Sequence, residues 1–161
     1  MLDSYELDTG PWWDPDASGS TRGTYYAPGE VWNTNSTIFV HDTVTVHDGV
    51  GSAILQDQWN DHPDSTVFFI RKYPGISNPI QDSQFGTIEK LEVWLYGNAS
   101  EDLLRFCIDD YDGHEVSEWL PIDWTGWQLV SWDLTVHTVI AWVAGNGVLD
   151  GSLVDFYSFQ T

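Results

Sequence analysis

Residues 88–109 read IEKLEVWLYGNASEDLLRFCID and hold two runs in which apolar and polar side chains alternate. Alternation with a period of two is typical of strands that bury one face and expose the other. In the first run, the side chains expected to face the core are Leu91, Val93 and Leu95, and those expected to face outward are Glu92, Trp94 and Tyr96.

The second run repeats the pattern after a short polar segment. Its expected core side chains are Leu104, Phe106 and Ile108, and its expected outward side chains are Arg105, Cys107 and Asp109. Because only residues 97–102 separate the two runs, we expect the two strands to pair. Their outward faces would then form one surface of aromatic, acidic and guanidinium groups. The alternative is that the long N-terminal segment covers this face, which would make Trp94 a core residue.

Similar short runs, bounded by Gly, Pro, Asn and Asp, continue along the chain, and no helical periodicity is present. Residues 37–46 are expected to form a hairpin or a bulged strand, because His41 and Asp42 interrupt the alternation. The other expected strands are residues 52–59, 66–73, 88–96, 103–109, 116–120, 127–134, 136–143 and 152–160. Short strands separated by turns every 8 to 12 residues or so are typical of two-sheet antiparallel folds. The sequence therefore predicts an all-β fold, an antiparallel β-sandwich or jelly roll.

The size and composition of the chain predict one folded domain over residues 1–161. The chain has 42% hydrophobic and 15% aromatic residues, which excludes the aromatic-poor composition of acidic disordered segments. Residues 9–35 lack strand alternation but contain Trp12, Trp13 and Trp32. We expect them to form an ordered excursion packed on the domain, because long loops of this kind are usually functional or packed.

The charge balance excludes two classes of partner. The chain has 25 acidic and 5 basic side chains, a formal net charge of −20. Nucleic acids and anionic membranes are therefore not expected as partners, because both bind through Lys and Arg. Neither a signal peptide nor a run of about 18 apolar residues is visible in this sequence.

The many carboxylates of the chain make accidental acid pairs frequent. A glycoside hydrolase or lyase needs two carboxylates beside the scissile bond. Glu89 and Glu92, like Glu115 and Glu118, would point to opposite faces of an extended strand. A small jelly-roll enzyme with an acid pair is therefore an alternative hypothesis. No catalytic residue is assigned.

Metal ligands could come from two sets of residues, the His and Cys side chains and one acidic cluster. The histidines lack the spacing of zinc ligands. The single Cys107 has no second thiol and is most simply a buried small hydrophobic residue, although strand parity alone would place it outward. The acidic cluster of Asp109, Asp110 and Asp112 precedes Gly113, but the later glutamate and the helices of an EF-hand are missing. We interpret this cluster as an acidic β-turn, with calcium binding as the alternative.

Tryptophan content is the most informative feature of the composition. Ten Trp exceed what the core of a domain of this size needs, so some are expected on the surface. Flat aromatic faces stack on the apolar CH faces of pyranose rings, while nearby polar groups bind the hydroxyls. The candidate sugar-binding residues are Trp59, Arg71, Trp94, Tyr96, Arg105 and Trp119. Those expected in the core instead are Trp127, Trp132 and Trp142.

Five short pieces of the sequence, taken in order, resemble the galactose-binding-like β-sandwich carbohydrate-binding modules, the broad group that includes families 4, 9, 11, 22 and 35. The pieces are Asp3–Glu6, Ser18–Thr21, the Gly-rich turn His47–Ala53, the Gly-Trp strand within Trp124–Leu134, and Val154–Phe156. Two features depart from the group: the Trp-rich insertion after Gly10 and the extreme acidity.

The resemblance implies a structural calcium ion that joins the N-terminal strand, the Gly-rich turn and the last strand. Carried over by position, its ligands would be Glu6, Asp48 and Asp155. The resemblance also implies a non-catalytic module that binds polysaccharide beside a glycan-active catalytic domain of a larger secreted protein. Together with the aromatic content, it predicts binding of a neutral polysaccharide. The remaining alternatives are the small enzyme above and a structural module that packs on a neighbouring domain.

Overall fold

The computed structural model describes residues 24–25, 38–56, 69–72, 90–110, 113–149 and 155–160. Every regular element in these ranges is a β-strand, and all the strand pairs are antiparallel. The predicted all-β antiparallel class is confirmed for this part of the chain. No helix able to cross a membrane is found in the same ranges. The chain divides into two compact units, Met1–Ile76 and Ser77–Thr161.

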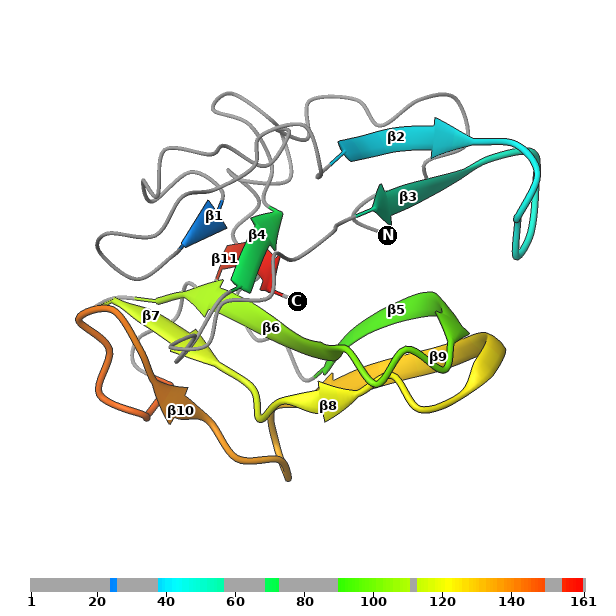
Figure 1. Ribbon diagram of the computed structural model, residues 1–161. Coiled ribbons are helices and arrows are strands. Elements are labelled where there is room, and N and C mark those ends of the chain that lie inside the picture. The colour runs from blue at the N-terminus through cyan, green and yellow to red at the C-terminus, as the bar shows by residue number, and fades with distance from the viewer. Residues whose placement is uncertain are drawn as a thin grey trace. The chain divides into compact units, whose positions relative to one another are not determined.

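The first unit contains two strand pairs (Figure 1). The short strand β1 (Thr24–Tyr25) pairs with β4 (Phe69–Lys72), and β2 (Ile38–Asp42) pairs with β3 (Ser52–Gln56). Asp42 ends β2 because its carboxylate accepts the backbone N–H groups of Val44 at 3.0 Å and Thr45 at 2.7 Å. Such local side-chain bonds compete with the strand ladder. The strand therefore stops at Asp42, where the alternation of residues 37–46 was expected to be interrupted.

The second unit is organised by one long β-hairpin, which can be followed in Figure 1 from β5 through β6 and back through β7 and β8 to β9. Its strands are β5 (Lys90–Asn98), β6 (Leu103–Asp109), β7 (His114–Val116), β8 (Leu120–Pro121) and β9 (Thr125–Asp133). The ladder begins at the pair Lys90↔Asp133 and ends at Asp109↔His114. A hydrogen bond of 2.9 Å from Asp110 N–H to the Gly113 carbonyl closes the hairpin.

Two irregularities interrupt this ladder and cancel each other. Between the last residue pair of β5 with β9 and the first pair of β6 with β8, the four residues 99–102 of one strand oppose the three residues 122–124 of the other. Between the last residue pair of β6 with β8 and the first pair of β6 with β7, the two residues 105–106 of one strand oppose the three residues 117–119 of the other. Each extra residue is a β-bulge, and bulges bend a strand and increase its twist. Because the bulges lie on opposite strands, the register of β6 with β7 continues that of β5 with β9.

The predicted pairing of β5 with β6 is wrong. The segment that joins them does not turn back, because Ala99 N–H donates to the Trp124 carbonyl at 2.8 Å and Glu101 N–H to that of Ile122 at 3.2 Å. Ala99 and Glu101 have φ values of 55° and 64°, in the left-handed region that forms the bulge. The segment is therefore a bend within one long strand, and β5 pairs with β9 instead.

The inner half of the hairpin belongs to a sheet with the strand order β11-β6-β7-β10. Strand β11 (Asp155–Gln160) pairs with β6, and β10 (Ile140–Ala141) pairs with β7. The buried apolar side chains of the described residues are Leu91, Leu104, Phe106, Cys107, Ile108, Val116, Val130 and Trp132. Trp132 thus lies in the core as predicted, and its ring stacks on Phe106 at 6.3 Å between centroids.

Cys107 is a buried small hydrophobic residue, as expected from its being a single thiol, and not an outward residue as strand parity alone would place it. Its side chain is completely buried, and so are those of its neighbours Phe106 and Ile108 on the opposite face. Both faces of β6 are therefore covered at this point. Alternation of burial is lost in a strand that lies between other strands and is covered on both sides.

The bend gives a testable prediction at Ala99. An L-residue in the left-handed region is strained by about 1–2 kcal/mol, which glycine avoids, although glycine also adds entropy to the unfolded chain. We expect Ala99→Gly to leave the free energy of unfolding unchanged or to raise it by up to about 1 kcal/mol. The matched Ala141→Gly change in β10 should lower it by about 0.5–1 kcal/mol. Urea unfolding followed by Trp fluorescence compares the two, and equal losses would contradict the assigned bend.

Candidate functional site

The outward face of the β5–β9 ribbon carries three large exposed side chains. Trp94 and Tyr96 are each 47% exposed, and Leu129 is 42% exposed. Trp94 lies opposite Leu129 in the ladder, and Tyr96 lies opposite Trp127. Directly paired residues of an antiparallel ladder point to the same side of the sheet. These four residues, Trp94, Tyr96, Trp127 and Leu129, are called the aromatic face below.

Two aromatic residues of this face hold each other in a fixed geometry. The ring centroids of Tyr96 and Trp127 are 5.5 Å apart, and the ring planes meet at 78°. Such edge-to-face contact is a favoured aromatic arrangement. Trp127 was expected in the core and is instead half-buried on the outward side. The reason is strand parity, since the buried residues of β9 are Val130 and Trp132, at even positions.

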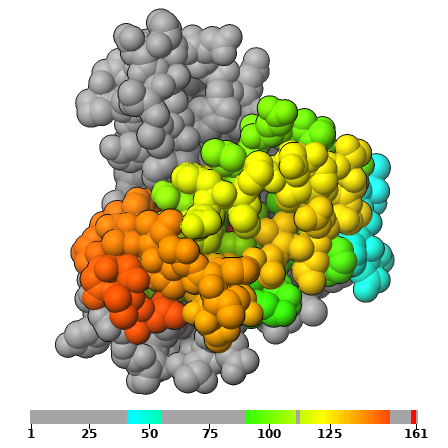
Figure 2. Space-filling model, turned by 90° about the horizontal axis from the view of Figure 1, so that it is seen from below, coloured from blue at the N-terminus to red at the C-terminus, as the bar shows by residue number. Residues whose placement is uncertain are grey.

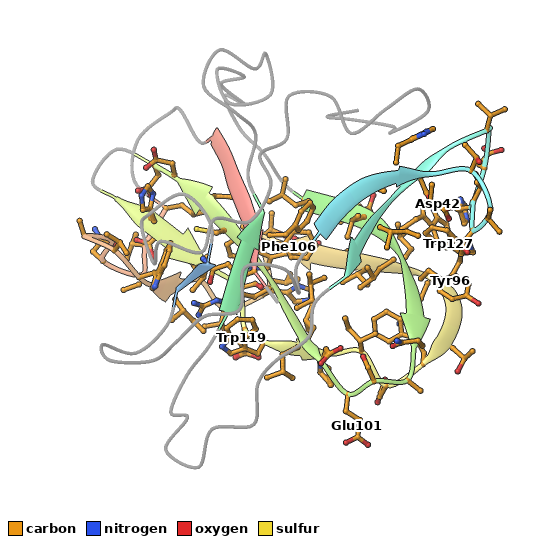
Figure 3. All side chains as sticks on the ribbon, turned by 45° about the horizontal axis from the view of Figure 1, so that its top comes forward. Asp42, Tyr96, Glu101, Phe106, Trp119 and Trp127 are labelled. Carbon is orange, nitrogen blue, oxygen red and sulfur yellow. The ribbon has the colours of Figure 1, made fainter. Side chains whose placement is uncertain are left out.

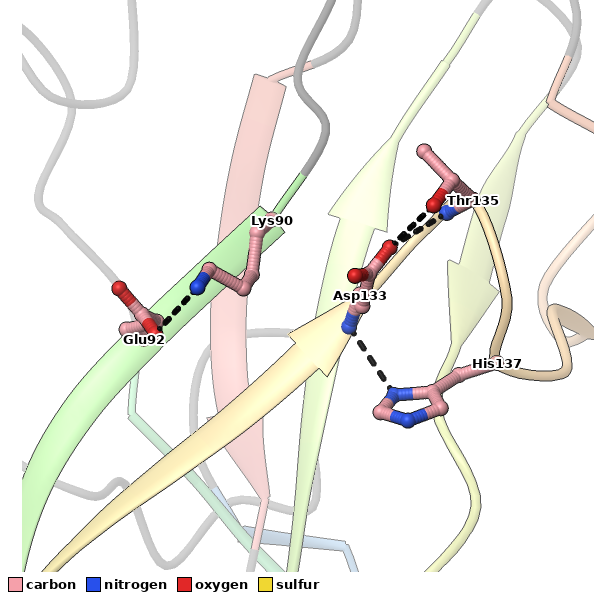
Figure 4. Close-up of polar contacts among 5 residues, drawn as sticks. All are labelled: Lys90, Glu92, Asp133, Thr135 and His137. Atoms are coloured by element: carbon pink, nitrogen blue, oxygen red, sulfur yellow. Dashed lines mark hydrogen bonds and ion pairs between the residues drawn. The ribbon is translucent and has the colours of Figure 1, made fainter.

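A polar group of side chains borders the aromatic face at the end of the ribbon where β5 begins (Figure 4). The Lys90 Nζ atom lies 2.8 Å from Glu92 Oε1, and Glu92 raises the pKa of Lys90. Asp133, opposite Lys90, accepts hydrogen bonds from the Thr135 hydroxyl at 2.6 Å and the Thr135 N–H at 2.9 Å. His137 Nδ1 accepts the Asp133 N–H at 3.0 Å. Carboxylate and ammonium groups thus lie on the same ribbon as the exposed rings, and the Thr135 hydroxyl lies in the turn that follows β9.

A second aromatic cluster surrounds Arg105 on β6. Its guanidinium carbon lies 4.2 Å from the centre of the Trp119 ring and 5.7 Å from that of Trp142. Arg105 Nε donates to Gln160 Oε1 at 2.6 Å, and burial lowers the pKa of Arg105. Cation–π contacts of this kind fix both partners. Trp142, expected in the core, is half-buried here.

The predicted sugar-binding residues are thus divided between two places. Trp94 and Tyr96 lie on the aromatic face, whereas Arg105 and Trp119 lie in the second cluster. Figure 3 shows Trp119 well apart from Tyr96 and Trp127. The separation follows from the bend, because β5 pairs with β9 and β6 with β7, β8 and β11. The single surface expected from pairing of β5 with β6 does not form.

Other candidate residues lie outside what the structure describes. Trp59, Glu6 and the side chains of Arg71 in β4 and Asp155 in β11 are among them. Asp48 is exposed, and its Oδ1 atom accepts the Gly49 N–H at 2.9 Å. Within the described ranges, no group of three or more His, Cys, Asp or Glu side chains is arranged to hold a metal ion. The calcium ligand set therefore stays a prediction.

Sequence reasoning missed two members of the aromatic face, Trp127 and Leu129. Both join Trp94 and Tyr96 only through the register of β9, which the pattern within β5 cannot reveal. A signal was present, however. If Val130 and Trp132 face the core, then Trp127, Leu129 and Ser131 must share the other side of the strand.

Comparison with protein-family models, with curated proteins and with solved structures finds no match for this chain. The functional reading of the site therefore depends on its geometry and on the sequence resemblance alone.

The Asp133 turn gives a pH-dependent prediction. Hydrogen bonds from the Thr135 hydroxyl and then from its N–H hold the pKa of Asp133 below its ordinary value of 3.8. Because the pKa of Asp133 is lower in the folded than in the unfolded state, its ionised carboxylate stabilises the fold at pH values above the unfolded-state pKa. This stabilisation is lost as the pH falls through the folded-state pKa. We expect Thr135→Val to raise the pKa of Asp133 in a carboxyl-carbon NMR titration. The pKa of Asp42, which Thr45 N–H lowers, is the internal control. An unchanged pKa of Asp133 in Thr135→Val would show that the Thr135 hydroxyl does not lower this pKa.

Proposed function

We propose that this protein is a non-catalytic carbohydrate-binding module that binds a neutral polysaccharide through its aromatic face. The observation that carries the proposal is the pair of exposed rings, Trp94 and Tyr96, two positions apart on one strand. Side chains two apart on a strand are about 7 Å from each other along its length. Two neighbouring rings on an open sheet face offer a surface on which consecutive sugar units of one chain can stack.

The rest of the face supports this use. Leu129 extends the apolar surface beside Trp94, and Trp127 braces Tyr96 by its edge-to-face contact. An aromatic ring held in place loses little conformational entropy on binding, which favours affinity. Pyranose rings present CH groups to such a surface, and dispersion together with burial of apolar area stabilises the contact.

The polar neighbours support a glycan rather than a purely apolar ligand. Glu92, Ser131 and Asp133 lie on the same side of the ribbon as the exposed rings. Carboxylates and hydroxyls accept and donate hydrogen bonds to sugar hydroxyls. Lys90 is the one basic residue within the β5–β9 ribbon, and it is paired with Glu92. With a net charge of −20, the protein would repel a strongly anionic polysaccharide.

The proposal also includes the type of fold, a structural metal ion and the larger protein to which the module would belong. The antiparallel strands and the sequence resemblance support a β-sandwich of the jelly-roll, galactose-binding-like type. In that family setting the module would be stabilised by calcium at Glu6, Asp48 and Asp155. It would belong to a secreted protein and keep an appended glycan-active enzyme close to its substrate.

The test is affinity gel electrophoresis in a panel of neutral soluble polysaccharides. Replacing either Trp94 or Tyr96 by Ala should weaken binding by about 1–3 kcal/mol, by analogy with stacking of bases on aromatic side chains. This corresponds to a dissociation constant about five to 150 times larger. Trp94→Phe keeps a ring and should retain most of the affinity.

Two control variants locate the site. Val136→Ala changes an apolar residue that is 73% exposed and lies outside the aromatic face, so it should not change binding. Trp119→Ala disrupts the cluster around Arg105 and should also leave binding intact if the fold is kept, which near-ultraviolet circular dichroism checks. The proposal fails if no polysaccharide retards the protein, or if Trp119→Ala abolishes binding while Trp94→Ala does not.

A further inference from the structure

The loop after β10 contains the pair Asn146–Gly147, whose sequence context makes the Asn side chain reactive. Asn146 is the one Asn of the sequence that is followed by Gly. Glycine has no Cβ atom, so its backbone nitrogen can approach the preceding side chain with little steric hindrance. Asn146 is exposed, and Figure 2 shows the segment around it, in orange, on the surface of the molecule. Water can therefore reach this pair.

The backbone conformation of the loop favours glycine at position 147. Gly147 has a φ of 82°, in the left-handed region that residues with a side chain rarely adopt. The residue that allows this turn thus also leaves the side-chain amide of Asn146 open to attack by the next backbone nitrogen.

A buried carboxylate holds both residues of the pair. Glu115 on β7 is completely buried, and its Oε1 atom accepts the N–H groups of Asn146 at 2.7 Å and Gly147 at 3.0 Å. Asn146 Oδ1 accepts the Val148 N–H at 2.7 Å. A Cβ atom on Gly145 would lie only 2.5 Å from Glu115 Oε1, so the loop backbone packs directly on the carboxylate. Both the Gly147 nitrogen and the Asn146 side-chain carbonyl are therefore held by hydrogen bonds.

We propose that Asn146 is a site of spontaneous deamidation, and that Glu115 sets its rate by holding the Gly147 N–H. In this reaction the Gly147 nitrogen loses its proton and forms a bond to Asn146 Cγ. The Cγ–Nδ2 bond breaks, and Nδ2 takes up a proton and leaves as ammonia. Water then opens the cyclic imide. Attack of water at Cγ gives Asp, and attack at the backbone carbonyl carbon gives isoaspartate.

Two features of the Glu115 contact slow this reaction in the folded protein. Loss of the Gly147 proton would create a negative charge 3.0 Å from Glu115 Oε1, and like charges repel strongly in a buried site. Movement of the Gly147 nitrogen toward Asn146 Cγ would also remove a hydrogen bond from a completely buried carboxylate, which is costly. The reaction therefore requires local opening of the loop, which releases the N–H first.

The products no longer fit the contact with Glu115. Either product has a new carboxylate on the residue whose N–H group Glu115 accepts. In isoaspartate the chain continues through Cβ and Cγ, which adds one backbone atom between the N–H groups of residues 146 and 147. The two groups are then no longer spaced to meet one carboxylate oxygen. Deamidation therefore weakens the attachment of the loop to β7, and this inference is independent of sugar binding.

Peptide mapping of the whole chain over time measures the reaction. The protease Asp-N, which cleaves before Asp, releases residues 133–149, in which Asn146 is the one amide side chain. Deamidation changes the mass of this peptide by the exchange of NH for O. Asp at position 146 creates a new cleavage site and isoaspartate does not, so the digest separates the two products. We expect the folded chain to react at least about tenfold more slowly than the chain in urea.

Substitution of Glu115 tests its role directly. Glu115→Gln keeps the size and a carbonyl oxygen of the side chain but removes its charge, so we expect deamidation at least about tenfold faster than in the unaltered folded chain. Glu118→Gln is the matched control, because Glu118 is exposed and follows β7 in the same segment, and it should leave the rate unchanged. Near-ultraviolet circular dichroism checks that both variants are folded.

Hydrogen exchange provides a second measurement that needs no substitution. Exchange of the Gly147 N–H requires the same opening of the loop and the loss of the same proton. We expect NMR to show this exchange to be at least about tenfold slower in the folded chain than in the chain in urea. This result decides the question if Glu115→Gln does not fold.

Four results would overturn the proposal. The first is no mass change of the 133–149 peptide in urea, and the second is equal deamidation rates in the folded and unfolded chain. The third is exchange of the Gly147 N–H at the rate of the unfolded chain. The fourth is a folded Glu115→Gln variant that reacts at the same rate as Glu118→Gln.

Discussion

The antiparallel ladder between Lys90–Asp109 and His114–Asp133 is the constraint on which the second unit depends. Its register fixes which side chains share a face along the whole hairpin. Two bulges on opposite strands divide it into an inner half within a larger sheet and an outer ribbon, β5–β9, without changing that register. Because bulges bend and twist a strand pair, the two halves have different neighbours.

That division explains why one half of the hairpin supplies the core and the other an exposed aromatic surface. Strand β6 lies between β11 and β7, and Leu104, Phe106, Cys107 and Ile108 are all buried. In β5, by contrast, burial alternates, with Leu91 buried and Trp94 and Tyr96 exposed. Retaining large exposed rings beside a well-packed core costs solubility unless polar groups surround them. The acidic side chains of this protein serve that purpose at the ribbon.

Charge is distributed unevenly between the aromatic face and residues 134–149. Around the rings, Glu92 and Asp133 offer hydrogen-bonding groups. Around Val143 and Val148, residues 134–149 offer no charge at all, and a buried carboxylate, Glu115, holds their loop from beneath. The polar groups around the rings support the proposal of a ligand rich in hydroxyls.

Much of the fold could be predicted from the period-two pattern. The range of β6 agrees residue for residue, and β3, β4, β5, β9 and β11 fall within two to three residues of the expected ranges at most of their ends. The outward orientation of Trp94 and Tyr96 followed from the same pattern. Pairing could not be predicted, because a six-residue polar segment can be either a turn or a bulged bend. That one ambiguity caused the error in the placement of Arg105. Trp127 was misplaced because the apolar composition of its strand was given more weight than strand parity.

The most direct test of the account is an NMR titration of the indole N–H signals with the oligosaccharide of whichever neutral polysaccharide retards the protein most. If the outer ribbon is the binding surface, the signals of Trp94 and Trp127 should shift together with saturable dependence on ligand concentration. Those of Trp132, in the core, and of Trp119 and Trp142, beside Arg105, should stay in place. Shifts confined to Trp119 and Trp142, with Trp94 unchanged, would contradict the account.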